Sequence, residues 1–267
     1  MPPVRRGELV LHVALRPVMR LWRLGMLEAW GNSPCAEDPP YEYVNGPDPV
    51  RVLLLGGNAV AGFGVLTHQL GLVGHLCRQL AQATGRGIEV EACAQVGMTL
   101  DELLVRVCDL PRVRTGVVVV ALGVNDILRL TPLRMWRRGL QRLFNVIRED
   151  AAENVQVIVV ESPPMHRLHG LAWLPSRIAH WQSRLLNEST RMVCDGLDYV
   201  TMVPFPVDAR EARAGIVRGS AETYRAWAAK LTVHLENAVR RTQEPAMSRH
   251  PGTSQVMPLL DRVLPQP

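Results

Sequence analysis

The chain has 267 residues, a length that suits one α/β domain. Of its residues 47% are hydrophobic and 21% charged, a globular composition that excludes a disordered or fibrous protein. Its formal net charge is +5, but every basic residue except Lys230 is an arginine, and these arginines are scattered among acidic residues. Because a nucleic-acid groove requires a basic stripe with interleaved aromatic side chains, we expect no nucleic-acid partner.

The first predicted element is a basic amphipathic helix within residues 1–30. Helical periodicity runs from Gly7 to Trp30, and Pro17 predicts a kink or break near its middle. Its polar side consists of His12, Arg16, Arg20 and Arg23. We expect the apolar side to pack on the domain, and the alternative is a peripheral membrane contact through residues 7–30.

The same region predicts neither a membrane span nor a secretion signal. No apolar run reaches the roughly 18 to 20 residues that cross a bilayer. Arginines interrupt the apolar stretch near the amino terminus, and no small-residue cleavage site follows it. We therefore expect a soluble, cytoplasmic protein, with peripheral membrane association as the alternative.

Composition divides the rest of the chain into three parts. Residues 31–50 contain five prolines and predict an irregular connector. Residues 51–242 form the expected domain. Residues 243–267 are rich in Pro, Ser and Gln and predict a flexible tail.

Short aliphatic runs alternate with longer amphipathic stretches across the expected domain. The predicted strands are Arg51 to Leu55, Ile88 to Ala92, Val117 to Leu122, Val155 to Val160 and Leu197 to Met202. The predicted helices are Thr67 to Ala83, Leu100 to Val107, Pro132 to Ala152, Leu174 to Val193 and Ser220 to Val239. This pattern predicts a three-layer α/β/α sandwich with a five-stranded parallel sheet in a doubly wound, flavodoxin-like order.

Ligands of such sheets bind beyond the carboxyl ends of the strands, so the residues that follow each strand are the candidates for a site. The first strand runs into a small-residue turn from Gly56 to Val65, which fits neither phosphate-binding glycine motif. The third strand ends in Gly123-Val124-Asn125-Asp126.

This Gly-Val-Asn-Asp segment resembles the GxND block of SGNH (GDSL-type) hydrolases, and the resemblance extends over about 180 residues, from Arg51 to Lys230. It implies the flavodoxin-like fold of that superfamily and an ester-hydrolase ancestry. It also implies that Asn125 and the backbone N–H of Gly97 form an oxyanion hole. Pro163-Pro164, the Leu174 to Asn187 helix and the Ser220 to Lys230 helix also match family members.

The catalytic positions implied by the resemblance carry other residues. Asn58 stands at the nucleophile position, after Gly57, while Gly215 stands at the aspartate position and Arg218 at the histidine position. There is no serine between Cys35 and Glu161 and no histidine between Trp181 and Val233, so sliding the alignment cannot restore the triad. Neither a carboxamide nor a guanidinium can replace the missing groups.

We therefore predict a catalytically impaired, pseudo-esterase member that binds a small acylated or anionic ligand in the remnant cleft. The expected ligand-binding residues are Gly97, Asn125, Gly57, Asn58 and Arg218. One alternative is an active carboxyl-ester hydrolase with a substituted nucleophile, for which Cys93 with His68 is the candidate dyad. Another is a membrane-peripheral or interaction module built on the first helix.

The remaining candidates predict structural roles. His166 and His169 form an HxxH pair in a loop, which we expect to be a surface feature and not a metal site. Asp126 is expected to fix its loop or to cap the following helix. The five cysteines contain no CxxC pair and predict reduced thiols, and we expect no cofactor. The oligomeric state stays open.

Overall fold

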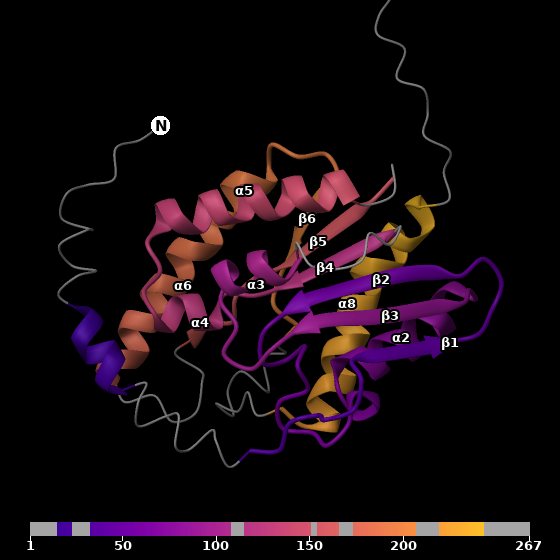
Figure 1. The fold of residues 1–267 in the computed structure, drawn as a ribbon, viewed down its shortest axis with the longest axis horizontal. Helices are drawn as coiled ribbons and strands as arrows, with labels where there is room; N and C mark the ends of the chain where they lie inside the picture. The colour runs from indigo at the N-terminus through magenta and orange to yellow at the C-terminus, as the bar shows by residue number, and fades with distance from the viewer. Residues whose placement is uncertain are drawn as a thin grey trace, which may run out of the picture.

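The fold is a three-layer sandwich in which helices cover both faces of one sheet (Figure 1). The computed structural model describes residues 15–22, 33–107, 115–150, 154–165, 173–206 and 219–242. The predicted tail over residues 243–267 lies outside the described residues, as do residues 7–14 and 23–30 of the predicted first helix.

The sheet has six strands in the order β1-β3-β2-β4-β5-β6. The strands are β1 (Tyr41–Val44), β2 (Val50–Gly56), β3 (Ile88–Ala94), β4 (Val117–Ala121), β5 (Gln156–Val160) and β6 (Val200–Val203). All neighbours from β3 to β6 are parallel, and β1 joins the β3 edge in antiparallel orientation. The five parallel strands have the flavodoxin-like order, so that prediction is confirmed.

Strand β1 is the difference from the predicted five-stranded sheet. It lies within residues 31–50, where the prolines predicted an irregular connector. Tyr41 to Val44 pair with Ile88 to Glu91 of β3, although prolines stand on both sides of the pairing segment. The prediction was wrong at these residues because four alternating positions between prolines are too short a pattern to predict a strand. Pairing with β3 stabilises a strand that would not form by itself.

Helices lie on both faces of the sheet. Those described are η1 (His68–Leu70), α2 (Leu72–Thr84), α3 (Leu100–Val107), α4 (Val124–Leu128), α5 (Leu133–Asp150), α6 (Trp173–Cys194) and α8 (Ala221–Arg241). Two core clusters show how they are arranged: α2 and α8 pack on one face, and α3, α4, α5 and α6 pack on the other.

Strand β4 shows why both faces need cover. Its valines are all buried, and they alternate between the two core clusters, with Val117 and Val119 in one and Val118 and Val120 in the other. A strand with no polar face is stable only where helices exclude water from both sides. The near-continuous hydrophobic strands of the sequence therefore predicted the layering correctly.

The predicted helix from Thr67 to Ala83 is not one continuous helix. Gly71 is extended, with φ −86° and ψ −172°, and it separates η1 from α2. The structure also contains a helix that was not predicted: the short α4, which begins directly after Gly123 within the Gly-Val-Asn-Asp segment.

Part of the predicted first helix is described. Residues 15–22 are helical across Pro17, and Met19 is 1% exposed in the core cluster that contains α5 and α6 residues. Leu15 and Trp22 are partly buried against the same cluster. This part therefore packs an apolar side on the domain. None of the described helices is long and apolar enough to cross a membrane.

Candidate functional site

The candidate site lies where the strand order reverses. Strand β2 pairs with β3 on one side and with β4 on the other, and Gly56 at its end is level with Ala121 at the end of β4. Connections from these two strands leave in opposite directions, which opens a ligand-binding position at the carboxyl edge. Gly57 and Asn58 follow β2, and Asn125 follows β4 after a short turn.

The side chain of Asn58 faces hydrogen-bond donors from the loop after β3 and from α4. The backbone N–H of Gly97 donates to Asn58 Oδ1 at 2.8 Å, and Asn125 Nδ2 lies 3.5 Å from the same oxygen. An N–H group can only donate, so the atom that faces Gly97 is the carboxamide oxygen. Asn58 thus holds a carbonyl-type oxygen against the two donors that the resemblance implied for a substrate oxygen.

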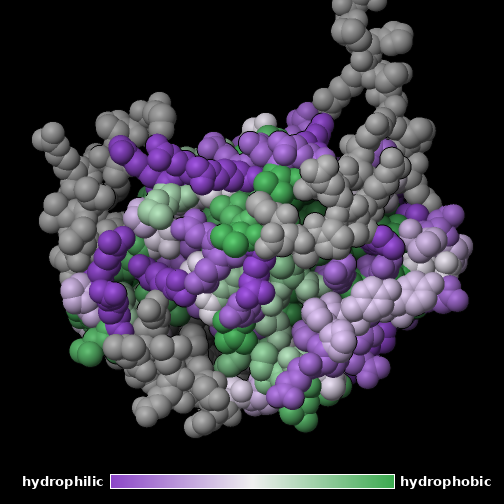
Figure 2. Space-filling model, in the orientation of Figure 1, coloured by the Kyte–Doolittle hydropathy of each residue, from purple (hydrophilic) through white to green (hydrophobic). Residues whose placement is uncertain are grey.

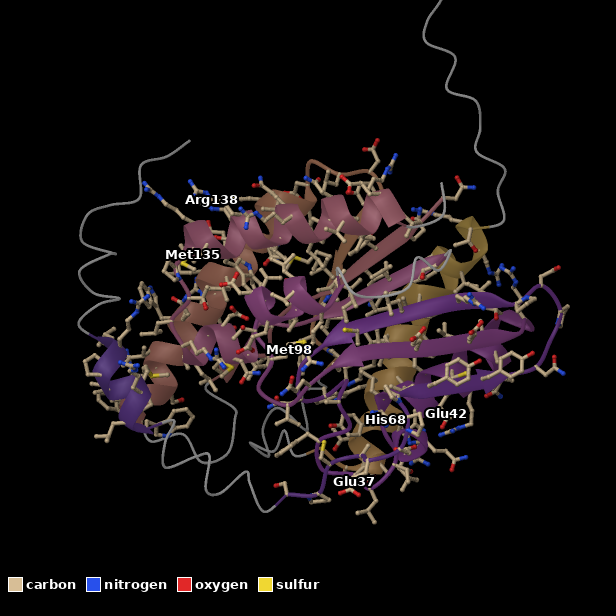
Figure 3. The ribbon with its side chains drawn as sticks, in the orientation of Figure 1. Glu37, Glu42, His68, Met98, Met135 and Arg138 are labelled. Atoms are coloured by element: carbon tan, nitrogen blue, oxygen red, sulfur yellow. The ribbon has the colours of Figure 1, made fainter. Side chains whose placement is uncertain are left out.

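The side chain of Asn125 is held in place by the loop that follows β3. Its Nδ2 donates to the backbone oxygen of Met98 at 3.1 Å, and the residue is only 9% exposed. Met98, labelled in Figure 3, lies near the carboxyl ends of β2 and β3. Sequence analysis did not identify this carbonyl, because a backbone acceptor leaves no signal in the residue type.

Two glycines shape the backbone around these side chains. Gly97 has φ +83°, a left-handed conformation that glycine adopts without cost, and in this conformation its N–H points to Asn58. Gly123 has φ +121°, and a Cβ there would overlap the hydroxyl of Ser162. The glycine before Val124 is therefore required by both backbone geometry and the close approach of the β5 loop.

Asp126 joins the two loops that carry the donors. Its Oδ2 accepts from the backbone N–H of Leu100 at 3.1 Å, and its Oδ1 accepts from Thr131 Oγ1 at 3.0 Å. The carboxyl therefore caps α3 and not the helix that follows it in sequence, which corrects one of the two roles predicted for it. Burial raises the pKa of Asp126 to about 6, although the hydrogen bonds from Thr131 and Leu100 act in the opposite direction.

The loop between β3 and α3 is held by further contacts. Thr99 N–H donates to Glu102 Oε2 at 2.8 Å while Glu102 N–H lies 3.4 Å from Thr99 Oγ1, the reciprocal pair of a capping box. Arg129 bridges from the α4 side, with Nη1 3.1 Å from Glu102 Oε1 and Nη2 3.5 Å from the Gly97 oxygen. The N–H of Gly97 thus sits in a backbone segment restrained on both sides.

The alternative Cys93 and His68 dyad is not assembled. Cys93 packs against the core cluster on the α3 and α5 face, and burial raises the pKa of its thiol. His68 is 5% exposed, and its Nδ1 lies 3.0 Å from Asp38 Oδ1. Figure 3 shows His68 on the side of Glu37 and Glu42 and not beside Met98. Sequence analysis missed Asp38, because nothing in a 30-residue separation signals this pairing.

Gly215 and Arg218, at the predicted aspartate and histidine positions, lie outside the described residues, as does the His166 and His169 pair that was expected to be a surface feature. The structure does show where the chain emerges after Arg218. Gly219 packs directly on Phe63 and Gly64 of the turn that follows Asn58. Within the described part of the chain, no group of His, Cys, Asp and Glu side chains could hold a metal ion.

Several solved structures with a similar fold are named as esterases, lipases or lipolytic proteins. Esterase EstA from Pseudoalteromonas sp., in a form inhibited by monoethylphosphonate, aligns with a TM-score of 0.54 at 16% identity, covering 71% of this chain and 98% of the esterase. A lipolytic protein of the G-D-S-L family from Veillonella parvula gives 0.53 at 14% identity, with coverages of 68% and 95%. Lipase Lip_vut3 from a goat rumen metagenome gives 0.52 at 13% identity, with coverages of 69% and 96%.

At these identities the three structures establish the fold alone. Comparison with the sequences of curated proteins gives no significant match. The profile of the GDSL-like lipase/acylhydrolase family, however, matches residues 54–253, which is most of the chain. The match includes the turn after β2, the loop after β3 and the Gly-Val-Asn-Asp segment. The chain therefore belongs to the GDSL-like lipase/acylhydrolase family.

Proposed function

We propose that this chain is a GDSL-family protein that has lost ester hydrolysis and binds a small acylated or anionic ligand beside Gly97 and Asn125. The observation that carries the proposal is the 2.8 Å hydrogen bond from Gly97 N–H to Asn58 Oδ1. Through this bond Asn58, the residue predicted at the nucleophile position, occupies the donor that would hold a substrate oxygen.

The chemistry of Asn58 supports the loss of hydrolysis. Its amide nitrogen has a delocalised lone pair and no proton that is readily removed near neutral pH, so it cannot form an acyl intermediate. The donors around it are still suited to an acceptor. A carboxylate or acyl carbonyl oxygen matches the two N–H groups presented by the Gly97 backbone and the Asn125 side chain, once the Asn58 side chain turns away.

An active hydrolase that uses Cys93 is the second candidate, and the geometry favours it less. The nucleophilic form of a cysteine is the thiolate, and burial raises the pKa of the Cys93 thiol. A general base would also have to lie within hydrogen-bond reach of the thiol, but Cys93 packs on the α3 and α5 face whereas His68 lies on the side of Glu37 and Glu42 (Figure 3).

Titration with sodium butyrate tests the binding part of the proposal. Two-dimensional NMR of the full chain should show a saturable shift of the Gly97 amide resonance. In Asn58→Ala the affinity should rise about fivefold, because the variant removes an internal competitor whose hydrogen bond is worth about 1 kcal/mol. Asn45→Ala, which changes an exposed asparagine bonded only to Tyr43 among the described residues, should bind like the unmodified chain.

Two results would contradict the proposal. If the Gly97 resonance stays unmoved in both the unmodified chain and Asn58→Ala, the donors do not form an anion site. If both proteins bind butyrate equally, Asn58 does not compete for those donors.

A further inference from the structure

A second surface of the molecule has a composition unlike the rest. It consists of the helix over residues 15–22 and the amino-terminal turns of α5 (residues 133–138) and α6 (residues 173–177), which we call the arginine-rich end. Figure 1 shows these three segments at the same end of the fold. Met19, Trp136 and Ile178, one from each element, belong to one core cluster.

Charge at the arginine-rich end has a single sign. Residues 15–22 contain Arg16 and Arg20 and no acidic residue, and α5 and α6 reach their first acidic residues only at Glu149 and Glu188. None of the arginines in the three segments forms an ion pair with a carboxylate in the part of the chain that the structure describes. Figure 3 labels Arg138 and Met135 on the α5 part of this surface.

Large apolar side chains are exposed among these arginines. Leu21 is 75% exposed, Trp173 72% and Met135 50%, while Met19 on the opposite side of its helix is 1% exposed. The Arg177 guanidinium lies 5.6 Å from the centre of the Trp173 ring. Figure 2 shows hydrophilic and hydrophobic side chains next to one another at this end of the molecule.

We infer that the arginine-rich end docks on the surface of an anionic lipid bilayer. Arginine attracts lipid phosphates, and leucine, methionine and tryptophan side chains enter the boundary between headgroups and acyl chains. The positive ends of the dipoles of α5 and α6 point the same way as the arginines. A nucleic acid would leave the aliphatic side chains without a partner, so the combination favours lipid.

The position of this surface connects it with the candidate site. Helices α5 and α6 follow the parallel strands β4 and β5, so their amino-terminal ends lie at the carboxyl edge of the sheet. Asn58 and Asn125 lie at the same edge. Docking would therefore turn that edge towards the bilayer. The inference itself does not depend on whether the site binds a ligand.

Flotation of the full chain with lipid vesicles tests the inference. The chain should float with vesicles of phosphatidylcholine and phosphatidylglycerol, remain behind with pure phosphatidylcholine, and dissociate as salt is raised. Arg16→Gln and Arg20→Gln should each lower the partition coefficient about fivefold, the equivalent of roughly 1 kcal/mol per charge. Leu21→Glu should lower it by about tenfold or more.

Matched controls distinguish binding through the arginine-rich end from nonspecific binding to vesicles. Val233→Glu changes a valine that is 67% exposed on α8, and Arg240→Gln changes an exposed arginine paired with Glu236, so both should float like the unmodified chain. Circular dichroism verifies the fold of each variant. Failure of the unmodified chain to float with anionic vesicles would overturn the inference, as would equal losses in Val233→Glu and Leu21→Glu. Binding insensitive to Leu21→Glu would also overturn it, since it would indicate general polyanion or acidic-protein binding.

Discussion

Asp126 is a buried carboxyl that links the α4 loop to the first turn of α3 through Leu100. Burial raises its pKa from 3.8 to about 6, so between these values the folded chain holds a proton that the unfolded chain releases. This group therefore makes the free energy of unfolding fall as pH rises from about 4 to 6, by about 1 to 3 kcal/mol.

Asp126→Asn should remove this part of the pH dependence. The amide can accept from Leu100 and donate to the Thr131 hydroxyl, so the folded structure is retained. Urea unfolding at pH 4 and pH 7 measures the difference, with Asp195→Asn, which changes an exposed carboxyl just after α6, as the control. An unchanged pH dependence in Asp126→Asn would show that another group is responsible.

At the residue scale, the sequence predicted that Asn58, Gly97 and Asn125 meet but not how they are oriented, while Arg218, predicted beside them, lies outside the described residues. Asn58, Gly97 and Asn125 were expected at one edge because the ends of adjacent parallel strands converge there. The hydrogen bond between Asn58 and Gly97 joins residues 39 positions apart, and it depends on a side-chain rotamer and on the positive φ of a glycine. Neither has a signal in the residue types alone.

At the scale of elements, α8 docks on the turn after Asn58 through its first residues. Gly219 and Gly64 approach so closely that a Cβ on either would overlap backbone of the other segment. Tyr224 Oη also donates to the Phe63 oxygen at 2.6 Å, and Ser220 caps the helix by accepting from Thr223 N–H. The last helix is thereby tied to the loop that carries the site.

Gly219→Ala should break this docking. The added methyl would overlap the Phe63 oxygen and meet the Tyr224 hydroxyl at 2.6 Å, so the free energy of unfolding should fall by more than about 2 kcal/mol. Gly196→Ala is the matched control, since nothing lies within 4 Å of its added Cβ, and its effect should stay within about 0.5 kcal/mol. Equal melting temperatures of the two variants would refute the close contact.

Elements differed in how well the sequence predicted them. Long periodic helices such as α5 and α6 were predicted almost to their ends, because their apolar side is repeated over several turns. Strand β1 and the break at Gly71 were missed. A four-residue edge strand takes its stability from β3, and a single extended glycine within a helical pattern has no periodicity of its own.

At the scale of the whole molecule, order along the chain was enough to predict the flavodoxin-like topology. Buried strands that alternate with amphipathic helices allow few arrangements, because parallel connections have one hand and need cover on both faces. The profile match over residues 54–253 adds membership of the GDSL-like lipase/acylhydrolase family to this fold. We propose that the family's chemistry is lost at Asn58 while its oxygen-holding donors remain.

The initial rate of p-nitrophenyl acetate hydrolysis by the unmodified chain tests that claim most directly. We predict a rate close to that of buffer and little changed by Asn125→Ala, since the Asn58 carboxamide cannot form an acyl intermediate and its Oδ1 already faces the donors that would stabilise an oxyanion. The variant Asn58→Ser/Gly215→Asp/Arg218→His serves as the positive comparison and should exceed the unmodified chain by at least about a hundredfold. Turnover by the unmodified chain far above buffer, abolished by Asn125→Ala, would contradict the account.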